Sequence, residues 1–330
     1  MNSESWKDIL ASAAKTRADL LSRAGIKDDE ALPIIQGEKQ FPVLVPQPFI
    51  DKMEMGNPDD PLLLQVLSQA SEDIQQEGFI ADPLAEKNSN HQRGIIHKYH
   101  SRALVLLTGG CAVNCRYCFR RHFPYQENRL GKQHWQEVLE YLNKNTSLSE
   151  VILSGGDPLL LDDHLLENYI NQLEAIPHIT KLRIHTRLPV VIPQRITEKF
   201  VKLLNDSRFA CSIVFHINHP NEIDSLFEKQ IEPLQRSKTV LLNQSVLLKG
   251  INDSSEILCN LSEKLFTAGI IPYYLHLLDK VSGAAHFDMS KEAALIIYKE
   301  MHLKLSGYLV PKLTREEPGK GCKTPINLSL

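Results

Sequence analysis

The sequence lacks the features that mark a membrane-bound, secreted or nucleic-acid-binding protein. Among its 330 residues no apolar run reaches the roughly 20 residues that cross a bilayer. The formal net charge is only −3, so no electrostatic attraction to nucleic acid is expected. Residues 1–8 are polar and acidic and do not resemble a secretory signal. We therefore expect a cytoplasmic globular protein with no membrane and no nucleic-acid partner.

Cysteine is scarce too, and three of the six cysteines lie together. Cys111, Cys115 and Cys118 stand at C-x3-C-x2-C spacing, directly after the apolar run 103–107. A chain this long does not need disulfide bonds to stabilise its core. A zinc site usually has a second pair of Cys or His ligands, and no such pair follows at a suitable spacing. Iron–sulfur clusters usually take four cysteines, so three favour a [4Fe-4S] cluster with one iron open to a ligand. A structural zinc site and buried, inert thiols are the alternatives.

The remaining sequence predicts an α/β fold. Short β-rich runs alternate with helical patterns, and the expected strands are 103–108, 150–154, 181–186, 210–217, 240–246 and 272–277. The expected helices are 132–144, 162–175, 194–205, 222–235, 254–268 and 290–306. Six such units predict a partial (β/α)6, TIM-like barrel, since a closed TIM barrel has eight.

The N-terminal part has a different character. An amphipathic helix is expected over 4–22 and a short one over 62–71, with a proline-rich, extended stretch between them. We expect 1–95 to be a mainly helical extension packed on a core of residues 96–330, which ends in a lysine-bearing segment.

Polar groups lie at or near the end of every expected strand. They include Cys111 after the first strand, Gly155-Gly156-Asp157 after the second, Arg187 after the third and His216 in the fourth. Active sites of β/α barrels form at the carboxyl ends of the strands, so these groups predict one shared site.

The cysteine spacing resembles the signature of the radical S-adenosylmethionine (SAM) superfamily, and Cys-Arg-Tyr-Cys-Phe-Arg-Arg resembles its lysine 2,3-aminomutase branch. In that family the cysteines hold a [4Fe-4S] cluster whose free iron binds SAM. The resemblance implies a radical SAM barrel and an isomerase that moves the 2-amino group of L-lysine to carbon 3.

The resemblance also implies a SAM pocket. Gly155, Gly156 and Asp157 match a segment that binds the SAM amino group through backbone carbonyls, although the glycines alone would equally fit a tight turn. His216 and Gln244 are further candidates for contacts with SAM.

A second cofactor, pyridoxal 5′-phosphate (PLP), is implied near the C-terminus. Lys323, in Pro-Gly-Lys-Gly-Cys-Lys-Thr-Pro, matches the lysine that holds PLP, and Lys320 is the competing lysine at the wrong offset. Without the resemblance, a solvated lysine near a terminus would be the expectation. Arg102 and Arg187 match family arginines at the PLP site, with Arg187 expected to hold the phosphate.

Three further residues are implied to bind the substrate. Arg120 matches the arginine that pairs with the substrate carboxylate, to which a planar guanidinium is suited. Asp279 matches an aspartate that holds the ε-ammonium of lysine, and Glu316 stands where the family has a second aspartate. Ordinary ion pairs or solvated loop acids are the alternative interpretation of all three.

The chain is short for this family, and with Glu316 it resembles the aminomutase of the elongation factor P β-lysylation pathway. That implies a pathway link to elongation factor P and its lysyl ligase, and a low-potential reductant such as flavodoxin or ferredoxin. The rivals are a radical SAM aminomutase for another amino acid, such as glutamate, a PLP-independent radical enzyme, and a non-catalytic iron–sulfur protein.

Overall fold

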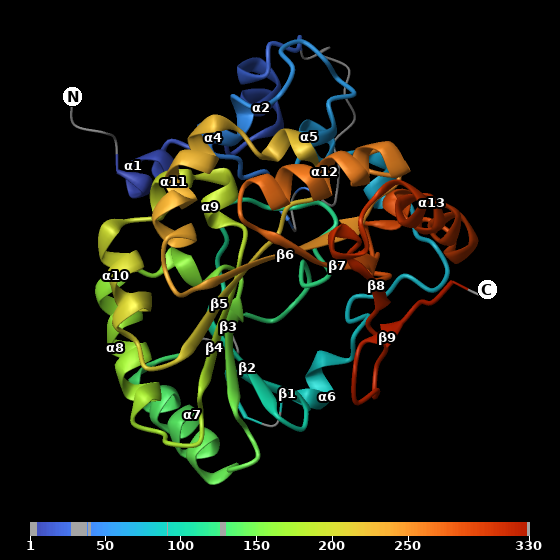
Figure 1. Cartoon of the computed structure of the whole chain (residues 1–330). Coiled ribbons are helices and arrows are strands. Elements are labelled where there is room, and N and C mark those ends of the chain that lie inside the picture. Colours follow the sequence, from blue (N-terminus) through green and yellow to red (C-terminus); the bar gives the residue numbers. More distant parts are fainter. Residues whose placement is uncertain (1–4, 28–37, 39–40, 91, 126–129, 329–330) are drawn as a thin grey trace.

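A single curved sheet forms the centre of the molecule (Figure 1). The structure is a computed structural model that describes residues 5–27, 38, 41–90, 92–125 and 130–328. Each strand pairs with the next one in the sequence; β2 to β8 run parallel, and β1 and β9 pair antiparallel at the two edges. The strands are β1 Ile95–Tyr99, β2 Arg102–Thr108, β3 Glu150–Gly155, β4 Lys181–Thr186, β5 Ala210–Phe215, β6 Val240–Leu247, β7 Ile271–Leu277, β8 Lys312–Arg315 and β9 Thr324–Pro325.

Helices connect successive parallel strands and cover the outer side of the sheet (Figure 1). The long ones are α7 Lys132–Lys144, α8 Asp163–Glu174, α10 Glu198–Asp206, α11 Ser225–Gln235, α12 Ser255–Thr267 and α13 Lys291–Lys304. Most begin at a Ser, Thr or Asp whose side chain accepts a backbone hydrogen bond from the first turn, as at Asp162 and Ser254. The α/β fold class and all six predicted strands are thereby confirmed.

The sheet extends beyond the predicted six strands. β8 adds a seventh parallel strand after α13, and β1 and β9 add the antiparallel edges. Among the described residues β1 and β9 do not pair with each other, so the barrel is open between them. This gap lies between the two segments that carry Lys98 and Lys323.

The helix expected over 4–22 is two helices, α1 Trp6–Ala11 and α2 Arg17–Arg23. The single-helix prediction is wrong because the backbone of Ala14 pairs with that of Val45, which interrupts the helical hydrogen bonds. The expected helix over 62–71 is likewise split, into α5 Pro61–Leu64 and the 3₁₀-helix η1 Ala70–Asp73. The other short α-helices with bounds among the described residues are α4 Gln47–Ile50, α6 Glu86–Ser89 and α9 Leu188–Val191.

The N-terminal region shares one hydrophobic core with the barrel. Leu20, Val45 and Phe49 are fully buried in the same cluster as strand residues such as Val105 and Leu153. Buried Lys52 also joins the two parts, because its ammonium donates to the carbonyls of Val190 at 2.9 Å and Glu222 at 2.8 Å. The division of the chain at residue 95 stays a prediction.

Candidate active site

The carboxyl ends of the parallel strands surround a cavity of about 260 Å³. Every site residue predicted from the sequence lines it: Cys111, Cys115, Cys118, Arg102, Arg120, Gly155, Gly156, Asp157, Arg187, His216, Gln244, Asp279, Glu316 and Lys323. The fold therefore brings together groups that are more than 200 positions apart in the chain. Their individual roles remain predictions.

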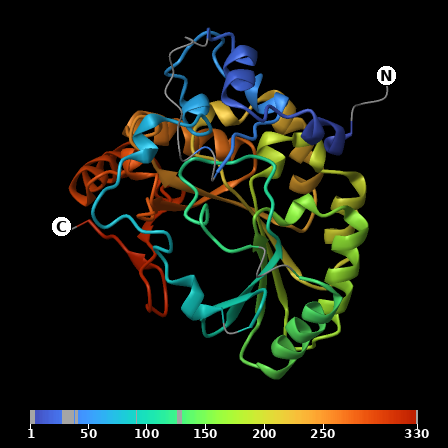
Figure 2. The ribbon, with the colours of Figure 1, turned by 180° about the vertical axis from the view of Figure 1, so that it is seen from behind.

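The segment that carries the cysteines crosses the sheet after β2 (Figure 2) and is anchored to the N-terminal region. The backbone N–H of Asn114 donates to the carbonyl of Leu44 at 3.1 Å, and that of Arg116 donates to Gln65 at 2.9 Å. Arg116 is fully buried and forms a two-pronged ion pair with Glu72. Glu72 also accepts from Arg121 at 2.7 Å, so a single buried carboxylate holds two arginines of the cysteine segment.

The three thiols form a soft donor set on one wall of the cavity. Burial, followed by the proximity of the other thiols, raises the pKa of Cys111 and raises that of Cys118 to about 11. No three His, Cys, Asp or Glu side chains among the described residues converge as ligands of a single metal ion. In a cubane each cysteine binds a different iron, so three thiols that line one cavity fit a cluster.

Gly155 and Gly156 are required by a close approach of two backbones. Gly155 has a φ of +120°, and a Cβ on Gly156 would lie 2.0 Å from the carbonyl oxygen of Gly110. The N–H groups of Gly156 and Asp157 donate to Thr108 at 2.7 Å and to Gly110 at 2.8 Å. Any other residue here would push the cysteine segment away from β3.

Asp157 connects the end of β3 to the end of β4. Its buried carboxylate accepts hydrogen bonds from the Thr186 hydroxyl and from the backbone N–H groups of Leu159, Arg187 and Leu188. Burial nevertheless raises the pKa of Asp157. Because these hydrogen bonds occupy the carboxylate, Asp157 contributes to the cavity by holding the ends of β3 and β4 together.

Arg187 lies on the cysteine side of the cavity. Its guanidinium donates to the Cys115 sulfur, to the Tyr117 hydroxyl and, at 3.0 Å, to the Glu222 carboxylate. Its Nε is buried and has no partner among the described residues. The contact of Arg187 with the PLP phosphate stays a prediction, and in the structure its guanidinium lies against Cys115, one of the three predicted cluster ligands.

Three uncharged histidines line the inner wall. Burial lowers the pKa of His216 to about 3, and it also lowers the pKa values of His185 and His276. The Gln244 amide donates to Nε2 of His216 at 2.9 Å, which places the imidazole hydrogen on Nδ1. Buried Nε2 of His185 has no hydrogen-bond partner among the described residues. This unpartnered atom and the His216–Gln244 pair provide uncharged hydrogen-bonding groups, which fit the adenosine part of SAM.

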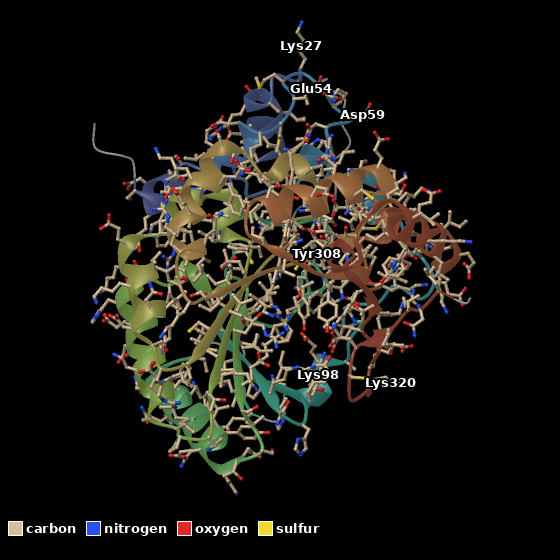
Figure 3. All side chains as sticks on the ribbon, in the orientation of Figure 1. Lys27, Glu54, Asp59, Lys98, Tyr308 and Lys320 are labelled. Atoms are coloured by element: carbon tan, nitrogen blue, oxygen red, sulfur yellow. The ribbon has the colours of Figure 1, made fainter. Side chains whose placement is uncertain are left out.

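The C-terminal segment brings Lys323 to the opposite side of the cavity. Its ammonium lies 2.5 Å from the Glu316 carboxylate and 5.7 Å from the ring centroid of Tyr274. Lys320 is exposed and lies at the outer end of the same loop (Figure 3), so Lys323 is the one of the two that faces the cavity. Arg102 stacks on Tyr99 at 4.0 Å and forms no ion pair with any described residue, which leaves its charge available for a phosphate. A half-buried lysine, an aromatic ring and an unpaired arginine fit PLP.

A chain of alternating charges runs along the cavity from the cysteines to Lys323. Arg120 holds Glu86 with two hydrogen bonds of 2.7 and 2.8 Å, and Glu86 lies 3.4 Å from Lys98. Lys98 in turn lies 3.5 Å from Glu316, the partner of Lys323. Burial opposes the charge of Glu316, but Lys323 and Lys98 lower its pKa to about 2. Glu86 and Lys98 were not predicted as site residues, because no sequence motif surrounds them.

Asp279 is the acid in the cavity that lacks a partner. Its carboxylate makes no hydrogen bond or ion pair with any residue in the described part of the chain. Burial, and then the charge of Glu316, raise its pKa to about 7 despite the opposing influence of Lys323. A carboxylate in this state gains much from a cation that enters the cavity.

Comparison with known proteins identifies the family. Residues 105–254 match the model of the radical SAM superfamily. The chain is 54% identical over 321 residues to the L-lysine 2,3-aminomutase of Haemophilus influenzae, covering 97% of this chain and 95% of that protein. It is 52% identical to the one of Escherichia coli, covering 99% and 96%. The chain belongs to the L-lysine 2,3-aminomutase family of radical SAM enzymes.

Membership confirms the predicted resemblance, and it makes this protein an isomerase of the aminomutase type. It also implies the three predicted cofactors, a [4Fe-4S] cluster, SAM and PLP. The L-lysine 2,3-aminomutase of Clostridium subterminale is more distant, at 31% identity, with 97% of this chain and 77% of that protein covered. No helix in the described residues is long and apolar enough to span a bilayer.

Proposed function

We propose that this enzyme converts L-lysine to β-lysine by moving the amino group from carbon 2 to carbon 3. The observation that carries the proposal is the unpartnered Asp279 carboxylate, which faces the same cavity as the Arg120 guanidinium. An amino acid with a cationic tail has an ammonium for Asp279 and a carboxylate for Arg120. The family relatives named above as L-lysine 2,3-aminomutases support the same substrate.

Cys111, Cys115 and Cys118 would hold the cluster, and Lys323 would hold PLP with Arg102 near its phosphate. When bound, the cluster and SAM supply a radical that removes hydrogen from carbon 3, and PLP supplies a conjugated ring that stabilises the unpaired electron. The groups of the chain itself provide position: Arg120 fixes the carboxylate end of lysine, and Asp279 and Glu316 fix the ammonium end.

Charge argues against glutamate as the substrate. A tail carboxylate would lie near Asp279 and the ionised Glu316 in a poorly solvated region, where like charges repel strongly and would raise the pKa of Asp279 further. The ammonium of lysine instead neutralises Asp279 and lowers its pKa.

We further propose that the product serves the β-lysyl modification of elongation factor P through a separate ligase, and that flavodoxin or ferredoxin supplies electrons in the cytoplasm. The support is the resemblance carried by Glu316 and the Pro-Gly-Lys-Gly-Cys-Lys segment. Deleting the gene should leave elongation factor P without β-lysine in mass spectra of the native factor, and an unchanged modification would remove this link.

The activity is tested by anaerobic reconstitution with iron, sulfide, SAM and PLP, followed by reduction with dithionite. We expect turnover of lysine and none of glutamate. SAM cleavage without any amino-acid product would favour another substrate, and no SAM cleavage would favour a non-catalytic iron–sulfur protein. Lysine turnover without added or bound PLP would favour a PLP-independent radical enzyme.

A further inference from the structure

Glu86 and Lys98 carry, on the wall of the cavity, the same two charged groups as the ends of a lysine molecule. The Glu86 carboxylate lies in the fork of Arg120, and the Lys98 ammonium lies against Glu316. The two side chains also pair with each other at 3.4 Å. Both line the cavity, and Figure 3 shows Lys98 on the strand next to α6.

We propose that Glu86 and Lys98 form an internal mimic of the substrate, which competes with lysine for Arg120 and Glu316 and thereby sets the affinity and the charge selectivity of the site. This inference rests on the proposed function, because it takes Arg120 as the receptor of the substrate carboxylate and Glu316 as a receptor of its ammonium.

The contacts of Arg120 require such a competition. Glu86 takes up Nε and Nη2, the edge of the guanidinium that binds a carboxylate with two parallel hydrogen bonds. The remaining nitrogen, Nη1, points at Ser154 and the Gly155 carbonyl, at 3.3 and 3.5 Å. A substrate carboxylate therefore gains a two-pronged contact only when Glu86 leaves.

Lys98 makes that departure feasible. A buried carboxylate that loses its only cation is strongly destabilised, but Glu86 keeps Lys98 as a second cationic partner. Lys98 in turn keeps Glu86 when an arriving ammonium takes its place on Glu316. The displaced Glu86 carboxylate and Lys98 ammonium stay paired with each other. Substrate binding therefore replaces some ion pairs by others and leaves neither charge without a partner.

The backbone before Glu86 is also strained. Ala85 has a φ of +47°, a left-handed conformation that is unfavourable for a residue with a Cβ. Glu86 begins α6, which is only four residues long, and its N–H is held by the Asp82 side chain at 3.0 Å. A short helix after a strained residue can change its conformation more easily than a long one.

The test is equilibrium binding to the anaerobically reconstituted holoenzyme, with SAM and PLP but without reductant, by isothermal titration calorimetry. The ligands are lysine, norleucine, which lacks the ε-ammonium, and cadaverine, which lacks the carboxylate. Glu86→Gln should bind lysine and norleucine about tenfold more tightly, corresponding to about 1.4 kcal/mol, and cadaverine unchanged. Lys98→Gln should tighten lysine and cadaverine and leave norleucine no tighter.

Weaker lysine binding in both variants would overturn the proposal, because Glu86 and Lys98 would then hold Arg120 and Glu316 in position for the substrate. Unchanged affinities would overturn it as well. Asp163→Asn is the matched control: it breaks a carboxylate–arginine pair, with Arg195 at 2.8 Å, whose residues do not line the cavity, and should alter no affinity. Iron content and thermal unfolding show whether each variant is folded and loaded.

Failure of the proposed function gives a different result. Arg120→Gln should abolish the preference of the protein for lysine over cadaverine. If that preference survives, the carboxylate binds elsewhere and the proposed function is at fault. If it is lost while Glu86→Gln fails to tighten lysine, only the internal mimic is wrong.

Discussion

Asp279→Asn should make the protein more stable and, at the same time, nearly unable to bind lysine. The native carboxyl has a pKa of about 7, against an ordinary value of 3.8, because it is buried close to Glu316. Its native state therefore binds a proton more tightly than its unfolded state. The protonated Asp279 carboxyl therefore adds to the free energy of unfolding. This contribution is complete below pH about 3.8 and is lost as the pH rises through about 7.

The size of the effect follows from the same values. A difference between 3.8 and about 7 corresponds to about 4 kcal/mol above pH 7, since a tenfold change in proton affinity is worth about 1.4 kcal/mol. Solvent at this half-buried side chain reduces the penalty to about 1–2 kcal/mol. Removing the charge should raise the melting temperature at pH 8 by about 2–4 °C, and by less at pH 5. Lysine binding should weaken by about a hundredfold, because the ammonium loses its carboxylate.

Thermal unfolding of the holoenzyme, followed by tryptophan fluorescence between pH 5 and pH 8, measures this difference. Asp288→Asn is the matched control, since its carboxylate lies 3.9 Å from Lys280 in the same connection between β7 and α13. A stability change for Asp279→Asn that is independent of pH, or a loss of stability at pH 8, would refute the reasoning. The first result would mean that the pKa of Asp279 lies outside this pH range, and the second that its carboxylate is ionised and paired in the folded protein.

Three other substitutions test separate parts of the structure. Gly156→Ala should destabilise the fold and prevent cluster loading, because the new Cβ would lie 2.0 Å from the Gly110 carbonyl oxygen. The iron content of the reconstituted variant measures cluster loading, and full loading would contradict this prediction. Glu72→Gln should cost about 3 kcal/mol in urea unfolding, since it leaves two buried arginines without a counter-charge; an unchanged midpoint would contradict it. Lys323→Ala should lose the visible absorbance of bound PLP, whereas Lys320→Ala should keep it.

The regular part of the fold could be predicted from the sequence. Apolar runs of five or six residues alternate with amphipathic helices, and this alternation is found again in β2 to β7 and in the long helices α7, α8 and α10 to α13. β8 escaped prediction because it has only four residues, Lys312–Arg315, and three of them are polar. The break between α1 and α2 depends on a contact of Ala14 with Val45, 31 positions away, which overrides the local helical pattern.

The site residues could be predicted from the sequence only where they lie in a recognisable motif. The cysteines and Lys323 lie in short runs with fixed spacing, so their shared cavity was expected. Glu86 and Lys98 lie in an unremarkable polar stretch and reach the site through a tertiary arrangement. No spacing in the sequence reveals that Arg120 would already hold a carboxylate of the protein itself.

The most direct test of the account is the fate of lysine labelled with ¹⁵N at its 2-amino group. The reduced enzyme, loaded with cluster, SAM and PLP, should yield β-lysine with the label on carbon 3, as resolved by chiral chromatography and mass spectrometry. Recovery of unchanged lysine from an enzyme that cleaves SAM and accepts another amino acid would contradict the proposed lysine site at Arg120 and Asp279.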